Sequence, residues 1–264
     1  MRAVAPVRPA APYIGGKRQL SKRLCEIIAA TPHSIYAEAF VGMGGVFFRR
    51  DEAPPTEVIN DRSQDVAVFF RILQRHYQAF MDMLKWQLTS RAEFERIAAQ
   101  NADSLTDLER AARFLYLQRL SFGGKVRSRV FGISTTGGAR FDTAKLGIVL
   151  EGIHERLTGV TIECLDWREF LRRWDRPGTL FYLDPPYWGT ESYYQPGLFS
   201  KGDHEALVQA LRGLRGRFIL TMTDCPEARA CYSGFRIETA ELSYTAAGGG
   251  RGEKKVSEMI VQSL

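Results

Sequence analysis

Short apolar segments alternate with segments of helical pattern along much of the chain. Five apolar runs have the length of strands, and helical stretches separate several of them. The predicted strands are 34–40, 56–60, 160–165, 179–183 and 217–222, and the clearest helices are 17–30 and 204–214. Apolar strands that alternate with helices are typical of an open α/β sheet covered on both faces.

The middle of the chain has a different pattern. Residues 66–157 are mostly helical, and they include a loop at 121–141 that is rich in Gly, Ser, Thr and basic residues. The best helix candidates in this part are 64–88, 91–100 and 106–120. A loop of that length inside a compact domain is usually functional. We therefore predict a sheet domain built from 1–65 and 158–264, interrupted by a helical insertion at 66–157.

Composition narrows the class of protein. Of the 264 residues, 45% are hydrophobic and 25% are charged, which is typical of a folded chain. The longest nearly apolar stretch, 35–48, contains Glu38 and is too short to cross a bilayer. The first twelve residues hold two arginines and three prolines but no apolar secretory core. The four cysteines lack CxxC spacing, so we expect reduced cytoplasmic thiols without a metal site.

The positive charge is concentrated in one segment. Residues 110–140 hold seven basic residues and no acidic one, although the whole chain has a net charge of only +6. The basic residues are Arg110, Arg113, Arg119, Lys125, Arg127, Arg129 and Arg140. A basic surface attracts nucleic-acid phosphates through counterion release. The alternative is a solvated helix face, which charge alone does not exclude.

A glycine-rich turn follows the first predicted strand. Phe40 and Gly42 belong to the run FVGMGG at 40–45, and glycines there allow a tight turn and close approach to a ligand. Asp61 ends the next strand, where an acid can accept hydrogen bonds from ribose hydroxyls. Because no GxxxxGK[ST] loop is present, a nucleoside without a pyrophosphate fits better than a nucleotide. A plain strand–helix turn is the alternative.

Lys17 is predicted to open a helix after two glycines. A cation at a helix N-terminus is unfavourable for the helix dipole, so a carboxylate partner, such as that of a methionine group, would explain it. A surface lysine is the alternative.

The predicted strand 179–183 runs directly into Asp184-Pro185-Pro186-Tyr187. Two prolines cannot continue a central strand, so the strand must end at Asp184. The prolines hold a carboxylate, a backbone carbonyl and an aromatic ring rigidly at the ligand edge of the sheet. Two acceptors beside one ring suit the exocyclic amine of a flat base. A strand-ending turn with a core aromatic is the alternative.

Together these motifs resemble the Dam-type DNA adenine-N6 methyltransferases from Tyr13 to Val261. The segments that carry the resemblance are YIGGK at 13–17, EAFVGMG at 38–44, ND at 60–61, RAARFLYL at 110–117, DPPY at 184–187 and RGEKKVSEMI at 251–260. The resemblance implies a Rossmann-like methyltransferase sheet with an inserted, mostly helical target-recognition domain. It also implies methyl transfer from S-adenosylmethionine to N6 of a flipped-out adenine in double-stranded DNA.

The resemblance also implies roles for particular residues. The cofactor residues would be Tyr13, Lys17, Phe40, Gly42, Asp61, Asp166 and Asp184. The catalytic residues would be Asp184, Pro185, Pro186 and Tyr187, with Tyr187 stacked on the adenine while Asp184 and the Pro185 carbonyl accept hydrogen bonds from N6. The DNA-binding residues would be Arg119, Phe122, Lys125, Arg127 and Arg129. We expect no metal and no membrane, and a monomer acting in the cytoplasm of a bacterium or a phage-infected cell.

The sequence departs from the family pattern at two places. Ser63 stands where these proteins usually have Asn, and Phe122-Gly123-Gly124 replaces an aromatic-Asn-Gly signature. The recognition sequence is therefore open, as is the presence of a cognate restriction enzyme. The alternatives are an N4-cytosine DNA methyltransferase, which more often has Ser as the first residue of the tetrapeptide, and a catalytically silent DNA-binding relative.

Overall fold

The computed structural model describes residues 1–132, 138–194, 197–245 and 253–263. Residues 133–137 of the predicted loop lie outside the described residues, and so do Arg251 and Gly252 of the last segment that resembles the family. No helix among the described residues is long and apolar enough to cross a membrane.

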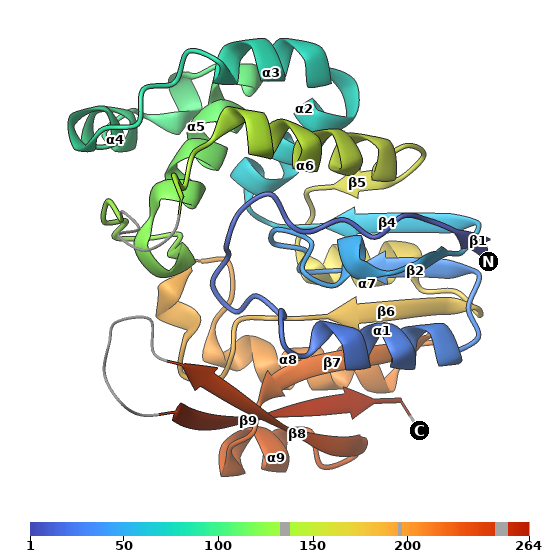
Figure 1. Cartoon of the computed structure of the whole chain (residues 1–264). Helices are drawn as coiled ribbons and strands as arrows, with labels where there is room; N and C mark the ends of the chain where they lie inside the picture. The colour runs from blue at the N-terminus through green and yellow to red at the C-terminus, as the bar shows by residue number, and fades with distance from the viewer. Residues whose placement is uncertain (133–137, 195–196, 246–252, 264) are drawn as a thin grey trace.

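The centre of the molecule is a seven-stranded sheet with the order β5-β4-β2-β6-β7-β9-β8 (Figure 1). Its strands are β2 (Ile35–Glu38), β4 (Thr56–Asn60), β5 (Thr161–Glu163), β6 (Thr179–Leu183), β7 (Arg217–Thr223), β8 (Arg236–Thr245) and β9 (Glu253–Gln262). The first five strands in the order are parallel, while β9 and β8 run antiparallel at one edge. A short pair, β1 (Arg2–Ala3) and β3 (Glu52–Ala53), lies apart. The predicted α/β sheet is confirmed.

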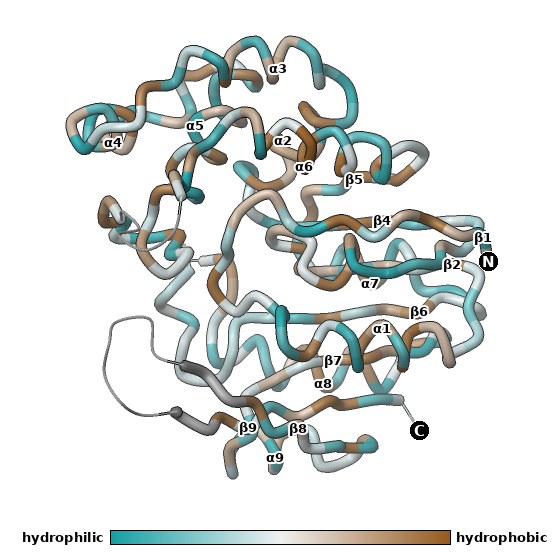
Figure 2. Tube along the Cα trace, in the orientation of Figure 1, coloured by the Kyte–Doolittle hydropathy of each residue, from teal (hydrophilic) through white to brown (hydrophobic). Residues whose placement is uncertain are grey.

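Helices cover both faces of the sheet because the central strands are apolar on both sides. On β6, Leu180 and Tyr182 join the core that contains α1, whereas Phe181 and Leu183 join the core beneath α7 and α8. The bounds of the helices on the sheet are α1 (Ser21–Ala30), α7 (Trp167–Trp174), α8 (Lys201–Arg212) and α9 (Pro226–Cys231). Figure 2 shows the hydrophobic stretches that run along the central strands. This arrangement leaves the strand ends as the accessible part of the sheet.

The middle of the chain forms a helical layer beside the β4–β5 side of the sheet (Figure 1). Its helices are α2 (Gln64–Arg75), α3 (Tyr77–Leu84), α4 (Arg91–Ala98), α5 (Asp107–Leu120) and α6 (Thr143–Arg156). Short 3-10 helices lie at Phe47–Arg49, Ala102–Ser104, Phe122–Gly124 and Glu191–Tyr193. Phe69 of α2 and Phe114 of α5 belong to the same hydrophobic core as Tyr36 and Ile59 of the sheet. The helical layer is thus packed directly on the sheet, and the predicted domain boundaries stay a prediction.

The predicted helix 17–30 was wrong at its start, because α1 begins at Ser21. The side chain of Lys17 is held by groups outside the helix, as described below. The predicted helix 64–88 was wrong in its continuity. The backbone of His76, with φ −132° and ψ 34°, separates α2 from α3. The apolar pattern continues across this break, so the pattern alone did not reveal it.

Candidate active site

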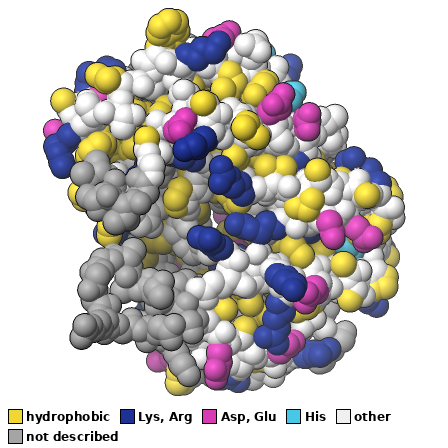
Figure 3. Space-filling view, viewed as in Figure 1, with side chains coloured by type: hydrophobic (Ala, Val, Ile, Leu, Met, Phe, Trp, Pro, Cys, Tyr) yellow, Lys and Arg dark blue, Asp and Glu magenta, His cyan; other side chains and the backbone are white. Residues whose placement is uncertain are grey.

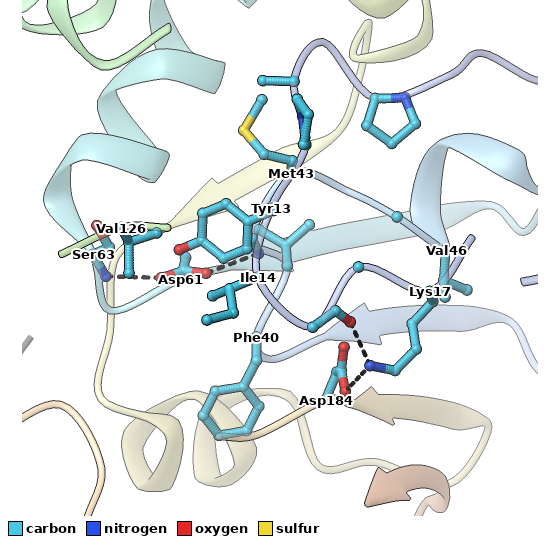
Figure 4. A pocket seen from close by; sticks show the side chains of 18 of the residues that line it. Tyr13, Ile14, Lys17, Phe40, Met43, Val46, Asp61, Ser63, Val126 and Asp184 are labelled. Carbon is cyan, nitrogen blue, oxygen red and sulfur yellow. Dashed lines mark hydrogen bonds and ion pairs between the residues drawn. The ribbon is translucent and has the colours of Figure 1, made fainter. Parts of the chain in front are cut away.

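A cavity of about 720 Å³ lies at the carboxyl ends of β2, β4 and β6 (Figure 4). Ligands of open parallel sheets bind at this edge, because the strand ends and the loops after them converge there. The N-terminal segment supplies Tyr13 and Lys17 to the cavity wall, and the turn after β2 supplies Phe40 and Gly42. Asp61 and Asp184 line the same cavity from the ends of their strands. Six of the seven predicted cofactor residues therefore meet in one place.

Gly42 lies close to the ring of Tyr13. Its φ of +50° favours glycine, and a Cβ at this position would lie 2.9 Å from Cδ1 of Tyr13. The amide of Gly42 donates to Oδ2 of Asp61 at 2.9 Å, and the amide of Ser63 donates to Oδ1 at 2.9 Å. Burial raises the pKa of Asp61 to about 6, although both amides lower it. The carboxylate is thus fixed in orientation, and its oxygens have lone pairs left to accept ligand hydroxyls.

Lys17 is a buried cation that forms an ion pair with the tetrapeptide. Its Nζ lies 2.7 Å from Oδ1 of Asp184 and donates to the carbonyl of Gly15 at 2.7 Å (Figure 4). The same Nζ lies 4.6 Å from the centroid of the Tyr187 ring. Burial raises the pKa of Asp184, and the neighbouring Lys17 ammonium opposes that rise. The carboxylate beside Lys17 is thus that of Asp184, and a contact of Lys17 with a methionine carboxylate stays a prediction.

A second polar chain reaches Asp184 from inside the sheet. The hydroxyl of Thr221 on β7 donates to Oδ1 of Asp184 at 2.8 Å. Because the single proton of Thr221 is used in this bond, the hydroxyl of Tyr182 must donate to Thr221, at 3.1 Å. Thr221 lies within a strand that carries no motif, so its contact with Asp184 could not be predicted from the sequence. Lys17 and Thr221 both contact Oδ1, so Oδ2 has no hydrogen-bond partner among the described residues.

The remaining tetrapeptide residues differ in their access to the cavity. Pro186 lines it, whereas Pro185 and Tyr187 lie outside its wall. The side chain of Tyr187 is half-buried, and its hydroxyl donates to Oε2 of Glu258 on β9 at 2.7 Å. Tyr187 is thus neither a core residue nor freely exposed. Its ring is in contact with the ammonium of Lys17, which does line the cavity.

Glu38 is a buried acid in the cavity wall. It belongs to the segment EAFVGMG at 38–44, but no role was predicted for it. Burial raises its pKa to about 8, and the hydroxyl of Tyr36 donates to its Oε2 at 2.6 Å. Phe40 packs edge-on against Phe199 with ring centroids 5.9 Å apart.

Asp166, the seventh predicted cofactor residue, lies outside the cavity wall and caps α7 by accepting from the amide of Arg168. Its cofactor role stays a prediction.

The basic segment forms less open surface than the charge count predicted. Of its seven basic residues, only Lys125 and Arg127 are exposed. Arg119 donates to the carbonyl of Arg140 at 2.7 Å, and Arg129 donates to Oε1 of Gln118 at 3.3 Å; both line the cavity. Arg119 and Arg129 thus bind acceptors of the protein itself, and the binding of phosphates by this segment stays a prediction. Figure 3 shows basic side chains gathered in the middle of the face seen in Figure 1.

Phe122 is presented by a short closed loop. Its amide donates to the carbonyl of Val130 at 3.0 Å, and the amide of Gly132 donates to the carbonyl of Leu120 at 2.8 Å. These bonds close the loop at its base, and the Phe122 side chain stays 50% exposed. The predicted role of Phe122 in DNA binding stays a prediction.

Comparison with known proteins gives the family of the chain. The D12 class N6 adenine-specific DNA methyltransferases match residues 13–246. The chain belongs to this family. It is 25% identical to the type II methyltransferase M1.LlaDCHI of Lactococcus lactis subsp. cremoris, over 97% of this chain and 95% of that protein. It is 27% identical to a DNA N-6-adenine-methyltransferase of Escherichia phage P1, over 81% of this chain but only 30% of that protein.

Membership confirms the predicted family and activity. The protein is an adenine-specific DNA methyltransferase, and DNA is its substrate. Family and fold imply S-adenosylmethionine as the methyl donor. No group of three His, Cys, Asp or Glu residues that could hold a metal occurs among the described residues.

Proposed function

We propose that the cavity binds S-adenosylmethionine and that the tetrapeptide presents the N6 amine of a flipped-out adenine to it. One observation carries this proposal. Asp61, Lys17 and Asp184 line a single cavity at the carboxyl edge of the sheet, although they are far apart in the sequence. The cavity therefore offers acceptors for a ribose at one end and a charged pair for an amino-acid group at the other.

The residues present fit the cofactor. The oriented carboxylate of Asp61 suits the two ribose hydroxyls, and a side chain larger than glycine at position 42 would push into Tyr13. The ammonium of Lys17 suits the carboxylate of a methionine group, and the carboxylate of Asp184 suits its ammonium. When bound, S-adenosylmethionine supplies an electrophilic methyl group on a positively charged sulfur.

The tetrapeptide would activate the amine by hydrogen bonding. Oδ2 of Asp184 and the carbonyl of Pro185 accept the two N6 hydrogens, which draws the nitrogen lone pair out of conjugation with the ring. The ring of Tyr187 supports the plane of the base. The ammonium of Lys17 covers one face of the Tyr187 ring. A base that stacks on this face would displace the ammonium, which would then pair with the carboxylate of the bound methionine group. Positioning and electrostatics supply most of the acceleration.

The surface around the cavity would bind the duplex. Phe122 would insert between bases, while Lys125 and Arg127 are exposed and contact phosphates or base edges. Arg119 and Arg129 line the cavity, so in this proposal they act nearest the flipped nucleotide. Action as a monomer, and in the cytoplasm, stays a prediction.

The test is methylation in a host that lacks DNA methyltransferases. The protein and its Asp184→Ala variant are expressed there, and modified bases are mapped by single-molecule sequencing. We expect N6-methyladenine within one sequence motif for the protein and none for the variant, with circular dichroism unchanged. Methylation at cytosine N4 would support the alternative amine substrate, and full activity of the variant would refute the catalytic assignment.

Binding of the cofactor is tested separately by thermal shift. S-adenosylmethionine should raise the melting temperature of the unmodified protein, and it should raise that of Asp61→Glu by less, because the longer side chain moves the carboxylate that is placed to meet the ribose. No stabilisation of the unmodified protein would favour a silent DNA-binding relative.

A further inference from the structure

The hydroxyl of Tyr187 has a buried partner that the proposed mechanism does not use. It donates to Oε2 of Glu258 at 2.7 Å, and Glu258 is only 5% exposed. Burial raises the pKa of Tyr187 well above its usual value, and the neighbouring carboxylates add to the rise. The phenol therefore keeps its proton and donates a hydrogen bond to Oε2 of Glu258.

The fold holds Glu258 firmly in place. It lies on β9 between two antiparallel neighbours, opposite Thr223 on β7 and Ala240 on β8. The amide of Asp224 also donates to the carbonyl of Ser257 at 3.0 Å, which extends the pairing beside it. A side chain on a strand that is paired on both sides is a stable anchor for a group on a loop.

A purely structural role explains Glu258 poorly. Glutamate is rarely buried, because removing its charge from water is costly without a good partner. Its negative charge also raises the pKa of Asp184, which opposes the ionised form that the reaction needs. The hydrogen bond to Tyr187 gives Glu258 a contact with the tetrapeptide through which it can act on the reaction.

We propose that Glu258 is a positioning residue that fixes the orientation of the Tyr187 ring for stacking of the target base. The inference rests on the proposed function of the tetrapeptide. Two side-chain torsions set the plane of a tyrosine ring, and the proline at position 186 fixes only the backbone before it. A hydrogen bond at the far end of the ring removes the remaining freedom, so the base meets a fixed surface.

The test is a double-mutant cycle on the full chain. Glu258→Ala, Tyr187→Phe and the double variant are compared with the unmodified protein in single-turnover methyl transfer to a duplex carrying its motif. We expect each single variant to lower the rate of methyl transfer about tenfold, and the double variant to be no slower than either. The dissociation constant for S-adenosylmethionine should change less than about twofold, since Glu258 lies outside the cavity wall.

Two further variants separate positioning from folding. Glu258→Gln keeps an acceptor for the phenol and should retain most of the rate, even if Glu258→Ala fails to fold. Glu241→Gln removes an exposed carboxylate from β8 of the same hairpin and is the matched control, with an unchanged rate. The inference would be overturned if the two single losses of rate multiply in the double variant, or if Glu258→Gln and Glu258→Ala lose the same amount of rate. The proposed function would stand in either case. Absence of adenine methylation by the unmodified protein would refute the proposed function, and this inference with it.

Discussion

Replacing Thr221 with valine tests how the protein keeps Asp184 ionised. Valine has the shape of threonine but lacks the hydroxyl, so the substitution removes one hydrogen bond to Oδ1 of Asp184 with little change in packing. Thr221 is fully buried, so water is poorly placed to replace the lost donor. The Lys17 ammonium remains 2.7 Å from the same oxygen.

The expected shift follows from the strength of a hydrogen bond to a charged group. Such a bond contributes about 1.5–3 kcal/mol, and one pKa unit corresponds to about 1.36 kcal/mol, so its loss raises the pKa of Asp184 by about 1–2 units. The side chain of Asp184 is still 18% exposed, so we expect about one unit, the lower end of that range. A bond to the ionised form favours ionisation, so its removal adds to the rise that burial already causes.

The assay is the pH dependence of kcat/KM for methyl transfer. Because Asp184 must be ionised to accept the amine hydrogens, activity falls as the pH drops through its pKa. The acidic limb of the profile of Thr221→Val should therefore lie about one pH unit higher than that of the unmodified protein. At pH values well above this limb, kcat/KM of the variant should be within a few-fold of that of the unmodified protein. An acidic limb that does not move, in a variant that is folded, would refute this account of Asp184.

Tyr182 supplies the control for stability. In Thr221→Val the Tyr182 hydroxyl loses its buried acceptor, which should lower the free energy of unfolding by about 1–3 kcal/mol in urea. Tyr182→Phe leaves the Thr221 hydroxyl on Asp184, so its acidic limb should stay close to that of the unmodified protein. The double variant should recover part of the stability while keeping the shifted pH profile. That result would separate the effect of the Thr221 hydroxyl on the pKa of Asp184 from its effect on the free energy of unfolding.

Three further outcomes follow from the cavity and from the core. Affinity for S-adenosylmethionine, measured by calorimetry, should weaken as the pH falls through about 6, where Asp61 gains a proton, and Asp61→Asn should bind weakly without that pH dependence. Gly42→Ala should also weaken binding, because its φ is +50° and its Cβ would lie 2.9 Å from a Tyr13 ring carbon; equal affinity would contradict the contact. Glu57→Gln should lower the free energy of unfolding in urea by about 3–5 kcal/mol, since Glu57 is 4% exposed and neutralises two buried arginines.

The sequence predicted the parts of the site that depend on local rules. The bounds of β4 and β6 match the predicted strands 56–60 and 179–183, because a polar residue or a proline pair ends each apolar run. Since parallel strands share one carboxyl edge, the acids that follow them could be placed together before any coordinates were known. The meeting of Asp61 and Asp184 in one cavity confirms that reasoning.

Contacts made by distant segments could not be predicted in the same way. Thr221 and Glu258 face the tetrapeptide because of the order and register of β7 and β9, which the apolar pattern does not encode. The exposure of the individual basic residues could not be predicted for a related reason. A count of charges does not show that Arg119 and Arg129 find acceptors in their own chain.

The two functional groups of the tetrapeptide are held by different parts of the fold. The carboxylate of Asp184 is held by Lys17 from the N-terminal segment and by Thr221 from β7, whereas the hydroxyl of Tyr187 is held by Glu258 from β9. Proline rigidity fixes the backbone between them, but each side chain still needs its own partner. Substitutions that remove the hydrogen bond between Glu258 and Tyr187 should therefore reduce the rate of methyl transfer and leave the affinity for the cofactor unchanged. Substitution of Lys17 should reduce both the rate and the affinity for the cofactor, because its side chain lines the cavity and also contacts the tetrapeptide.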